Sequence, residues 1–153
     1  MTYRNRKINA FSLVEITLAL GVAGFCFIAV LGLLPVGVQT NQRAIAQTGA
    51  TGIFSSVVSD FSATPKAATT STQYGIGLSA GSTTMLYFDS QGQFSTLLGA
   101  NSLYRLVVTI PTNPAGVNAA TFAYLRVTWP ALVDPLVTTP GGTSEMFAAF
   151  NRN

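Results

Sequence analysis

The chain has 153 residues, of which 48% are hydrophobic and only 8% are charged, and its formal net charge is +3. This length accommodates one domain and an additional segment, and the high hydrophobicity excludes an intrinsically disordered chain. Three of the eight basic residues lie before residue 10, and the remaining five balance the five acidic residues. Because no basic stripe remains to follow a phosphate backbone, we expect no nucleic-acid partner.

The first ten residues are short, polar and basic, with Arg4, Arg6 and Lys7 close together. They precede an uncharged apolar run, Ile16–Val38. At about 1.5 Å per residue a helix of this length reaches roughly 34 Å, enough to cross a bilayer core of about 30 Å. Basic residues beside a span favour the cytoplasmic side, so we expect a single-pass protein with its N-terminus inside and its C-terminus outside.

A secretory signal peptide begins in a similar way and is the first alternative. The sequence Ala44-Ile45-Ala46 has the small-x-small form of a signal-peptidase site. However, the apolar region of such peptides is usually about 7–15 residues long, and several polar residues separate this site from the apolar run. We therefore favour a membrane anchor.

A short motif joins the basic leader to the apolar run: Ala10-Phe11-Ser12-Leu13-Val14-Glu15. It resembles the class III signal of type IV prepilins and pseudopilins, in which a small residue precedes Phe-[Ser/Thr]-Leu-[Ile/Val]-Glu and a long apolar helix. The resemblance implies that a prepilin peptidase cuts between Ala10 and Phe11 and N-methylates Phe11. The family usually has Gly where this chain has Ala10.

The carboxylate of Glu15 stands at the edge of the expected membrane span. Such a group costs several kcal/mol in hydrocarbon unless it is paired, so it is a functional candidate. The resemblance implies that Glu15 of one subunit pairs with the Phe11 amine of a neighbour during filament assembly. The alternative is that Glu15 only marks the interfacial end of a membrane helix.

Two further features lie within the apolar run. Pro35 lacks a backbone donor, so we expect a helix break there, in the form of a kink or of local melting. In the pilin family a break in this region lets the helix stretch, and here it could equally mark where the helix leaves the membrane. Cys26 is the only cysteine and is interpreted as a small apolar residue.

Residues 39–62 are predicted to continue the helix, and 63–72 to form a loop. One apolar face of this helix should support a sheet, and it comprises Phe54, Val57, Val58 and Phe61.

The remainder has the period-two alternation and turn signals of antiparallel strands. The expected strands are Met85–Phe88, Phe94–Leu98, Leu103–Ile110, Phe122–Trp129 and Ser144–Asn151, with turns at 89–92 and 112–118 and a longer loop at 131–143. The predicted fold class is therefore α+β, a long N-terminal transmembrane helix packed on a small antiparallel sheet. This layout is pilin-like, and Val127-Thr128-Trp129-Pro130 resembles the minor pilins of the Verru_Chthon cassette protein B type.

The sequence thus divides into a leader peptide (1–10), a transmembrane and filament-core helix (11–38), a helix continuation (39–62) and a sheet head domain (63–153).

Catalytic and cofactor signatures are missing from the sequence. The chain has no histidine, its acids are scattered, and it has no phosphate-binding glycine loop or nucleophile elbow. We expect no enzyme activity and no cofactor. A calcium site built on Asp89 and Asp134 is conceivable, but solvated loop acids are commoner.

These features predict a structural subunit, a minor pilin or pseudopilin, of a type IV pilus-like or type II secretion-like filament. Its expected partners are a prepilin peptidase, other pilin or pseudopilin subunits, and the membrane. It would be stored in the inner (cytoplasmic) membrane and then enter a periplasmic or extracellular filament. The alternative is a membrane-anchored surface protein outside any filament, whose head binds a ligand or secreted substrate.

Overall fold

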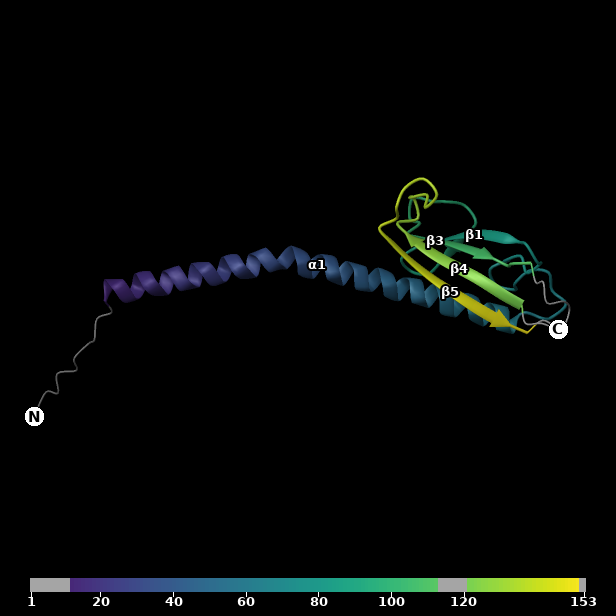
Figure 1. Cartoon of the computed structure of the whole chain (residues 1–153), viewed down its shortest axis with the longest axis horizontal. Coiled ribbons are helices and arrows are strands. Elements are labelled where there is room, and N and C mark those ends of the chain that lie inside the picture. The colour runs from purple at the N-terminus through teal and green to yellow at the C-terminus, as the bar shows by residue number, and fades with distance from the viewer. Residues whose placement is uncertain (1–11, 113–120, 152–153) are drawn as a thin grey trace, which may run out of the picture. The chain divides into compact units, whose positions relative to one another are not determined.

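The fold is α+β, with one long apolar N-terminal helix followed by a five-stranded antiparallel sheet (Figure 1). The computed structural model describes residues 12–112 and 121–151. The elements are α1 (Leu13–Ala63), β1 (Thr83–Phe88), β2 (Phe94–Ser95), β3 (Tyr104–Thr109), β4 (Thr121–Trp129) and β5 (Gly142–Phe150). The chain forms two compact units, Met1–Gln42 and Arg43–Asn153, so the last part of α1 belongs to the same unit as the sheet.

The sheet has the strand order β2-β1-β3-β4-β5, and every neighbouring pair is antiparallel. Its register places Leu86 beside Leu106, and Leu106 beside Val127. All three side chains are buried. Because side chains alternate along a strand, this register gathers the apolar residues of β1, β3 and β4 on one face.

The core of the second unit lies between that face and the C-terminal part of α1. Rings of Phe61 on α1 and Phe150 on β5 are stacked with centroids 5.0 Å apart. The predicted apolar face is confirmed at Phe54, Val57 and Phe61, which are buried, while Val58 is partly buried. The helical residues of the core are Ala50, Ile53, Phe54, Val57 and Phe61.

Most predicted strands are confirmed to within one or two residues, but the second is shorter than expected. β2 comprises only Phe94–Ser95 instead of Phe94–Leu98. The Ser95 hydroxyl accepts the Leu97 N–H at 3.1 Å, and the Ser102 hydroxyl accepts the Gly99 N–H at 3.0 Å. These local bonds take the place of ladder bonds, as serine side chains commonly do in turns. The turn expected at 112–118 falls almost entirely outside the described residues.

The helix break expected at Pro35 does not take the form of an interruption. Helix α1 is continuous from Leu13 to Ala63 and contains Pro35 in its interior. Proline removes one N–H, but its fixed φ is close to the helical value, and the residues on both sides keep their helical conformation. The local melting of the helix expected at Pro35 is therefore absent, whereas a kink there stays a prediction.

A buried carboxylate links the end of α1 to the loop that follows it. Oδ1 of Asp60 accepts the Gln73 N–H at 2.9 Å, and Oδ2 accepts the Tyr74 N–H at 3.2 Å. Asp60 is only 5% exposed. It satisfies two backbone donors, of which that of Tyr74 would otherwise be buried without a partner, so it positions the segment leading to β1.

We expect Asp60→Ala to lower the free energy of unfolding by about 1–3 kcal/mol, because it leaves these backbone donors unsatisfied. The measurement is urea unfolding of the full chain in detergent micelles, followed by the fluorescence of Trp129, the single tryptophan. Asp60→Asn keeps one acceptor oxygen and should lose less stability. Equal stability of Asp60→Ala and the wild type would contradict this role.

Candidate functional site

The predicted site residues are concentrated at the start of α1. Ala10 and Phe11 lie outside the described residues. The Ser12 carbonyl accepts the N–H groups of Glu15 at 3.0 Å and Ile16 at 3.2 Å, so the helix begins at this serine. Ser12 and Glu15 have the spacing of a capping box, in which a serine and a glutamate satisfy N–H groups of the first turn.

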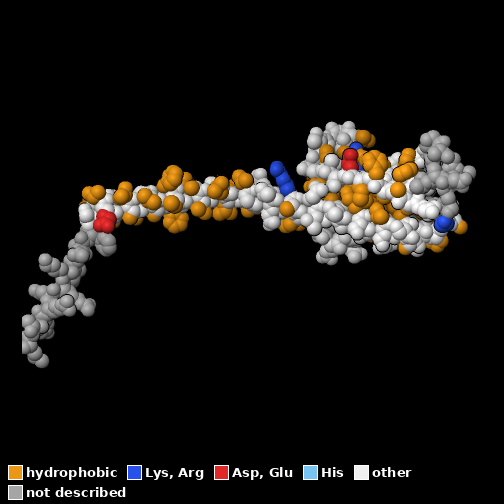
Figure 2. Space-filling view, turned by 60° about the horizontal axis from the view of Figure 1, so that its bottom comes forward, with side chains coloured by type: hydrophobic (Ala, Val, Ile, Leu, Met, Phe, Trp, Pro, Cys, Tyr) orange, Lys and Arg blue, Asp and Glu red, His pale blue; other side chains and the backbone are white. Residues whose placement is uncertain are grey.

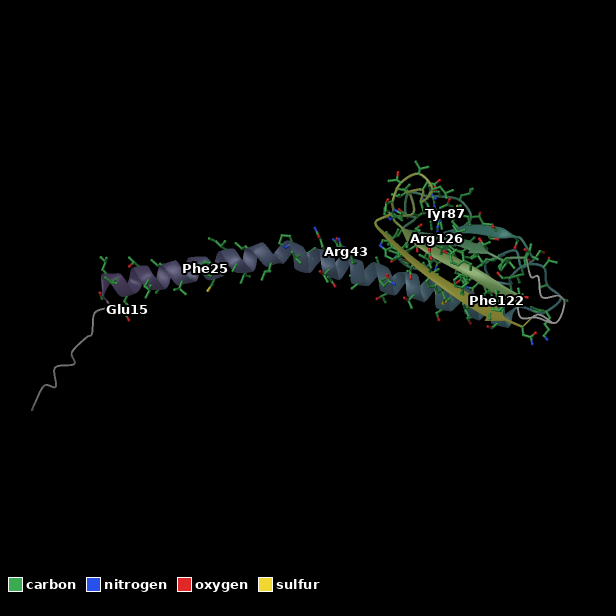
Figure 3. All side chains as sticks on the ribbon, in the orientation of Figure 1. Glu15, Phe25, Arg43, Tyr87, Phe122 and Arg126 are labelled. Carbon is green, nitrogen blue, oxygen red and sulfur yellow. The ribbon has the colours of Figure 1, made fainter. Side chains whose placement is uncertain are left out.

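The Glu15 side chain borders an apolar surface. One shallow hollow is lined by Glu15, Ile16, Ala19, Leu20 and Ala23, which follow one another along one helical face. Figure 3 places Glu15 at the beginning of the helix. Within the part of the chain that the structure describes, no cation forms an ion pair with this carboxylate. The carboxylate is therefore available for a cation from outside the described residues.

The N-terminal half of α1 is apolar on all sides. Every residue from Leu13 to Val38 is exposed, including Leu13 at 78% and Phe25 at 73%. Figure 2 shows hydrophobic side chains along the whole length of this segment. A helix that is hydrophobic all round needs either lipid or other helices to cover it. By its length and composition, α1 could span a membrane.

Small residues make part of this surface accessible to neighbouring helices. A Cβ atom at Gly21, Gly24 or Gly32 would meet no other atom within 4 Å. Cys26 is exposed on the same stretch, as expected for a small apolar residue in a segment that lipid would surround. These positions allow close backbone approach of a second helix.

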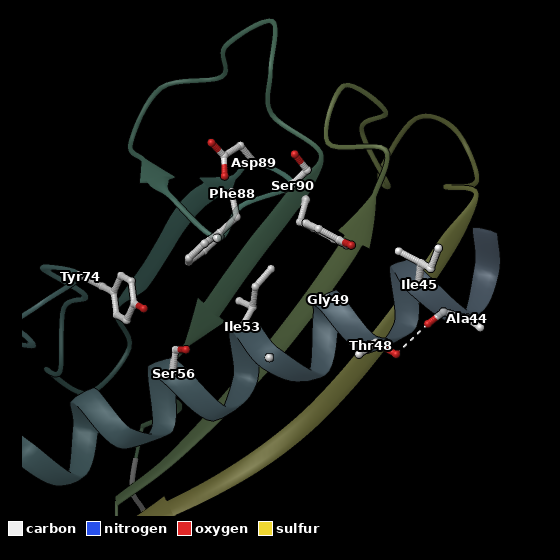
Figure 4. Close-up of a pocket in the computed structure, with 13 residues that line it drawn as sticks. Ala44, Ile45, Thr48, Gly49, Ile53, Ser56, Tyr74, Phe88, Asp89 and Ser90 are labelled. Carbon is white, nitrogen blue, oxygen red and sulfur yellow. Dashed lines mark hydrogen bonds between the residues drawn. The ribbon is translucent and has the colours of Figure 1, made fainter. Parts of the chain in front are cut away.

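The head contains a groove of about 590 Å³ between α1 and the turn that joins β1 to β2 (Figure 4). The hydroxyl of Tyr104 lies over Gly49, where a Cβ atom would collide with it. Gly49 therefore permits the close approach of α1 to β3. The groove is lined by Ala44, Ile45, Thr48, Gly49, Gly52, Ile53, Ser56, Tyr74, Phe88, Asp89, Ser90, Gly92 and Tyr104.

Burial raises the pKa of Tyr104 above its ordinary value of about 10. The native state therefore retains this proton at a pH where the unfolded chain has lost it. The contribution of Tyr104 to stability is complete below pH 10 and is lost as the pH rises from about 10 through the native pKa.

We expect Tyr104→Phe to reduce the loss of stability above about pH 10, because phenylalanine has no phenolic proton to release. The measurement is urea unfolding at a series of alkaline pH values. Part of the decrease in the free energy of unfolding with pH should persist, since burial and the nearby Glu145 also raise the pKa of Tyr124. If the free energy of unfolding of Tyr104→Phe depended on alkaline pH as that of the wild type does, Tyr104 would not be a source of this dependence.

The two acids considered for calcium have other partners. Oδ1 of Asp89 accepts the N–H groups of Gln91 at 2.8 Å and Gln93 at 2.9 Å. Oδ1 of Asp134 lies 3.3 Å from Nη1 of Arg105 and accepts the Leu136 N–H at 3.0 Å. Among the described residues, no three acidic or cysteine side chains gather as a metal site would require.

Arg105 is more buried than its position in the sequence suggests. The alternation of side chains along β3 places Arg105 on the outer face of the sheet, yet this residue is only 7% exposed. Asp134 reaches it from the loop between β4 and β5, and the Tyr87 ring lies 5.8 Å from its guanidinium carbon. The strand pattern contains no signal for this contact, because the loop residue comes from a distant part of the sequence.

Comparison with known proteins identified no relative. No protein-family model matches the chain, and neither a curated protein nor a solved structure matches it.

Proposed function

We propose that this protein is a structural subunit, a minor pilin or pseudopilin, of a type IV pilus-like or type II secretion-like filament. The observation that carries the proposal is the fully exposed apolar surface of α1 from Leu13 to Val38, with a single carboxylate, Glu15, in its first turn. In a helix that faces only lipid, this carboxylate is unfavourable and has no role. In a helix that moves from lipid into contact with other subunits, the carboxylate can form an ion pair with a cation of a neighbouring subunit.

Assembly would begin with processing of the leader. A prepilin peptidase would cut between Ala10 and Phe11 and methylate the new amine. The carboxylate of Glu15 would then pair with the Phe11 amine of an adjacent subunit, which neutralises both charges in an apolar environment. The pair would also set the axial position of each subunit relative to the next.

The same helix would determine the location of the protein. Before assembly it would cross the inner membrane once, with the basic leader in the cytoplasm and the head outside. In the filament, neighbouring apolar helices would replace the lipid around Leu13–Val38, and the heads would face outward.

Mass spectrometry of the mature N-terminus tests this function. We expect a chain that begins with N-methylated Phe11. A chain that begins at Gln47 would indicate a conventional secreted protein, and an intact Met1 would indicate a simple anchor. Either result would overturn the filament proposal.

The second candidate is a membrane-anchored binding protein outside any filament, and the groove beside Tyr104 favours it because it could hold a small ligand. The two candidates differ in where the protein is found. A filament subunit appears in the fraction sheared from the cell surface or in purified filaments, whereas an anchored binding protein stays with the membrane.

A further inference from the structure

The groove between α1 and the turn after β1 lies wholly within the second compact unit, because every residue that lines it falls within Arg43–Asn153. Its volume of about 590 Å³ is within the range of small-molecule sites, about 300–1,000 Å³. The buried side chains of Ile53 and Phe88 give it an apolar lining. Protein interiors contain few voids larger than a water molecule, so a space of this size is more than a packing defect.

Two tyrosine hydroxyls line this groove without a hydrogen-bond partner. Tyr104 is 4% exposed and Tyr74 is 6% exposed, and both line the groove. Among residues 12–112 and 121–151, neither phenol group forms a hydrogen bond. Buried tyrosine hydroxyls normally have a partner. Both groups are therefore available to a molecule that occupies the groove.

The two hydroxyls belong to different parts of the groove. That of Tyr104 lies over Gly49, whereas Figure 4 shows Tyr74 on the side of Ser56. Gly49 and Ser56 are about 10 Å apart along the helix axis. Burial raises the pKa of Tyr104, so this phenol keeps its proton at neutral pH and can donate it to an acceptor. An elongated ligand with an acceptor near each end matches this arrangement.

The charge of the lining restricts the ligand further. Asp89 is the only charged residue that lines the groove, and its Oδ1 already accepts the N–H groups of Gln91 and Gln93. No lysine or arginine lines the groove. An anionic ligand would lose its hydration beside this carboxylate without gaining a cation as a partner. The groove therefore disfavours carboxylates and phosphates.

Small residues of α1 keep the groove open. Ala44, Thr48, Gly52 and Ser56 recur at every fourth position, so they lie on one face of the helix, and all four line the groove. A Cβ atom at Gly52 would meet no atom within 4 Å. A larger side chain at this position would therefore occupy the groove without displacing the core.

We propose that this groove binds a small, elongated, mainly apolar molecule that has no anionic group and accepts hydrogen bonds from the hydroxyls of Tyr74 and Tyr104. The inference names the ligand class for the groove considered under the second candidate function, and it rests on that binding role and not on filament assembly. The mature N-terminus decides the filament proposal, and ligand binding decides this one, so the two failures are distinguishable.

Fluorine NMR of the full chain in lipid nanodiscs tests the site. Fluorotyrosine replaces the five tyrosines, and Tyr→Phe variants assign the resonances. The probe is N,N′-dimethylterephthalamide, a rigid ring with an uncharged amide carbonyl at each end. Two analogues are compared with it: N-methylbenzamide, which has one carbonyl, and the monoacid in which a carboxylate replaces one amide. Tyr124, on the outer face of the sheet, is the internal control.

We expect the diamide to shift the resonances of Tyr74 and Tyr104 saturably and to leave that of Tyr124 unchanged. It should bind about fivefold more tightly than the monoamide, the usual effect of one hydrogen bond. The monoacid should bind at least about tenfold more weakly than the diamide, because it brings a second negative charge into the groove. In Tyr104→Phe the diamide should lose its advantage over the monoamide, which a purely structural effect of the substitution would not cause.

Gly52→Leu fills the groove and should abolish binding of the diamide. Ser55→Leu is the matched control, because Ser55 is exposed on the same helix and does not line the groove. It should bind like the wild type. The proposal would be overturned by an absence of saturable shifts, by equal binding of the diamide and the monoacid, or by undiminished binding in Gly52→Leu.

Discussion

Glu15→Ala should remain in the membrane but fail to enter the filament. Loss of one partner of a buried ion pair costs about 3–5 kcal/mol, because the other charge stays buried and unpaired. This corresponds to a loss of about 100-fold or more in the incorporation equilibrium. Nothing else in the described chain would supply a carboxylate near the start of α1, because the next acidic residue is Asp60. The measurement is the amount of the variant in sheared filaments relative to the amount in the membrane.

Three comparisons make this result specific. Glu145→Ala removes an exposed carboxylate from β5 of the head and should leave incorporation unchanged. Glu15→Asp keeps the charge and should recover part of the incorporation. Mass spectrometry of Glu15→Ala reports whether the leader was still removed, which separates an assembly defect from a processing defect. Incorporation of correctly processed Glu15→Ala at the level of the wild type would eliminate the pairing role.

Leu125→Ala should produce the largest loss of head stability among single truncations on β4. Leu125 is fully buried at the centre of the sheet, where it pairs with Val108 of β3 and Met146 of β5. Removal of a buried leucine side chain costs about 2–5 kcal/mol, through lost transfer free energy and the cavity that remains. A domain of this size is typically stable by only about 5–15 kcal/mol, so the variant should lie close to unfolding.

Phe122→Ala is the matched control on the same strand. Its side chain is half exposed, so its truncation should cost less than about 1 kcal/mol. Urea unfolding of both variants in detergent micelles, followed by Trp129 fluorescence, gives the comparison. Equal losses in the two variants would show that the apolar face of β4 does not form the core described above.

Much of the secondary structure could be predicted because it depends on local periodicity. The alternation in Leu103–Ile110 and Phe122–Trp129 predicts β3 and β4 closely, since side chains of a strand point alternately to its two faces. The apolar face around Phe54 and Phe61 likewise follows from helical spacing. Two predictions made from single residues or short patterns did not hold. Pro35 does not melt α1 locally, and the strand expected at 94–98 ends at Ser95.

The candidate site at the start of α1 was also identified from the sequence, because its signal is a contiguous motif. The residues that depend on long-range contacts could not be found in this way. The sequence around Asp60 and Arg105 carries no local sign of their partners, which lie 13 or more residues away along the chain. The groove beside Tyr104 depends on the packing of α1 against β3 and on the turn after β1.

By itself, the sequence determined that the chain has an uncharged apolar run with one acid at its head and an alternating strand region, because composition and period are local properties. Only the tertiary structure decided that residues 43–63 of α1 share a core with the sheet. The physical reason is that strand order and register bring together segments that are distant in sequence, and these pairings are selected by the packing of the whole core.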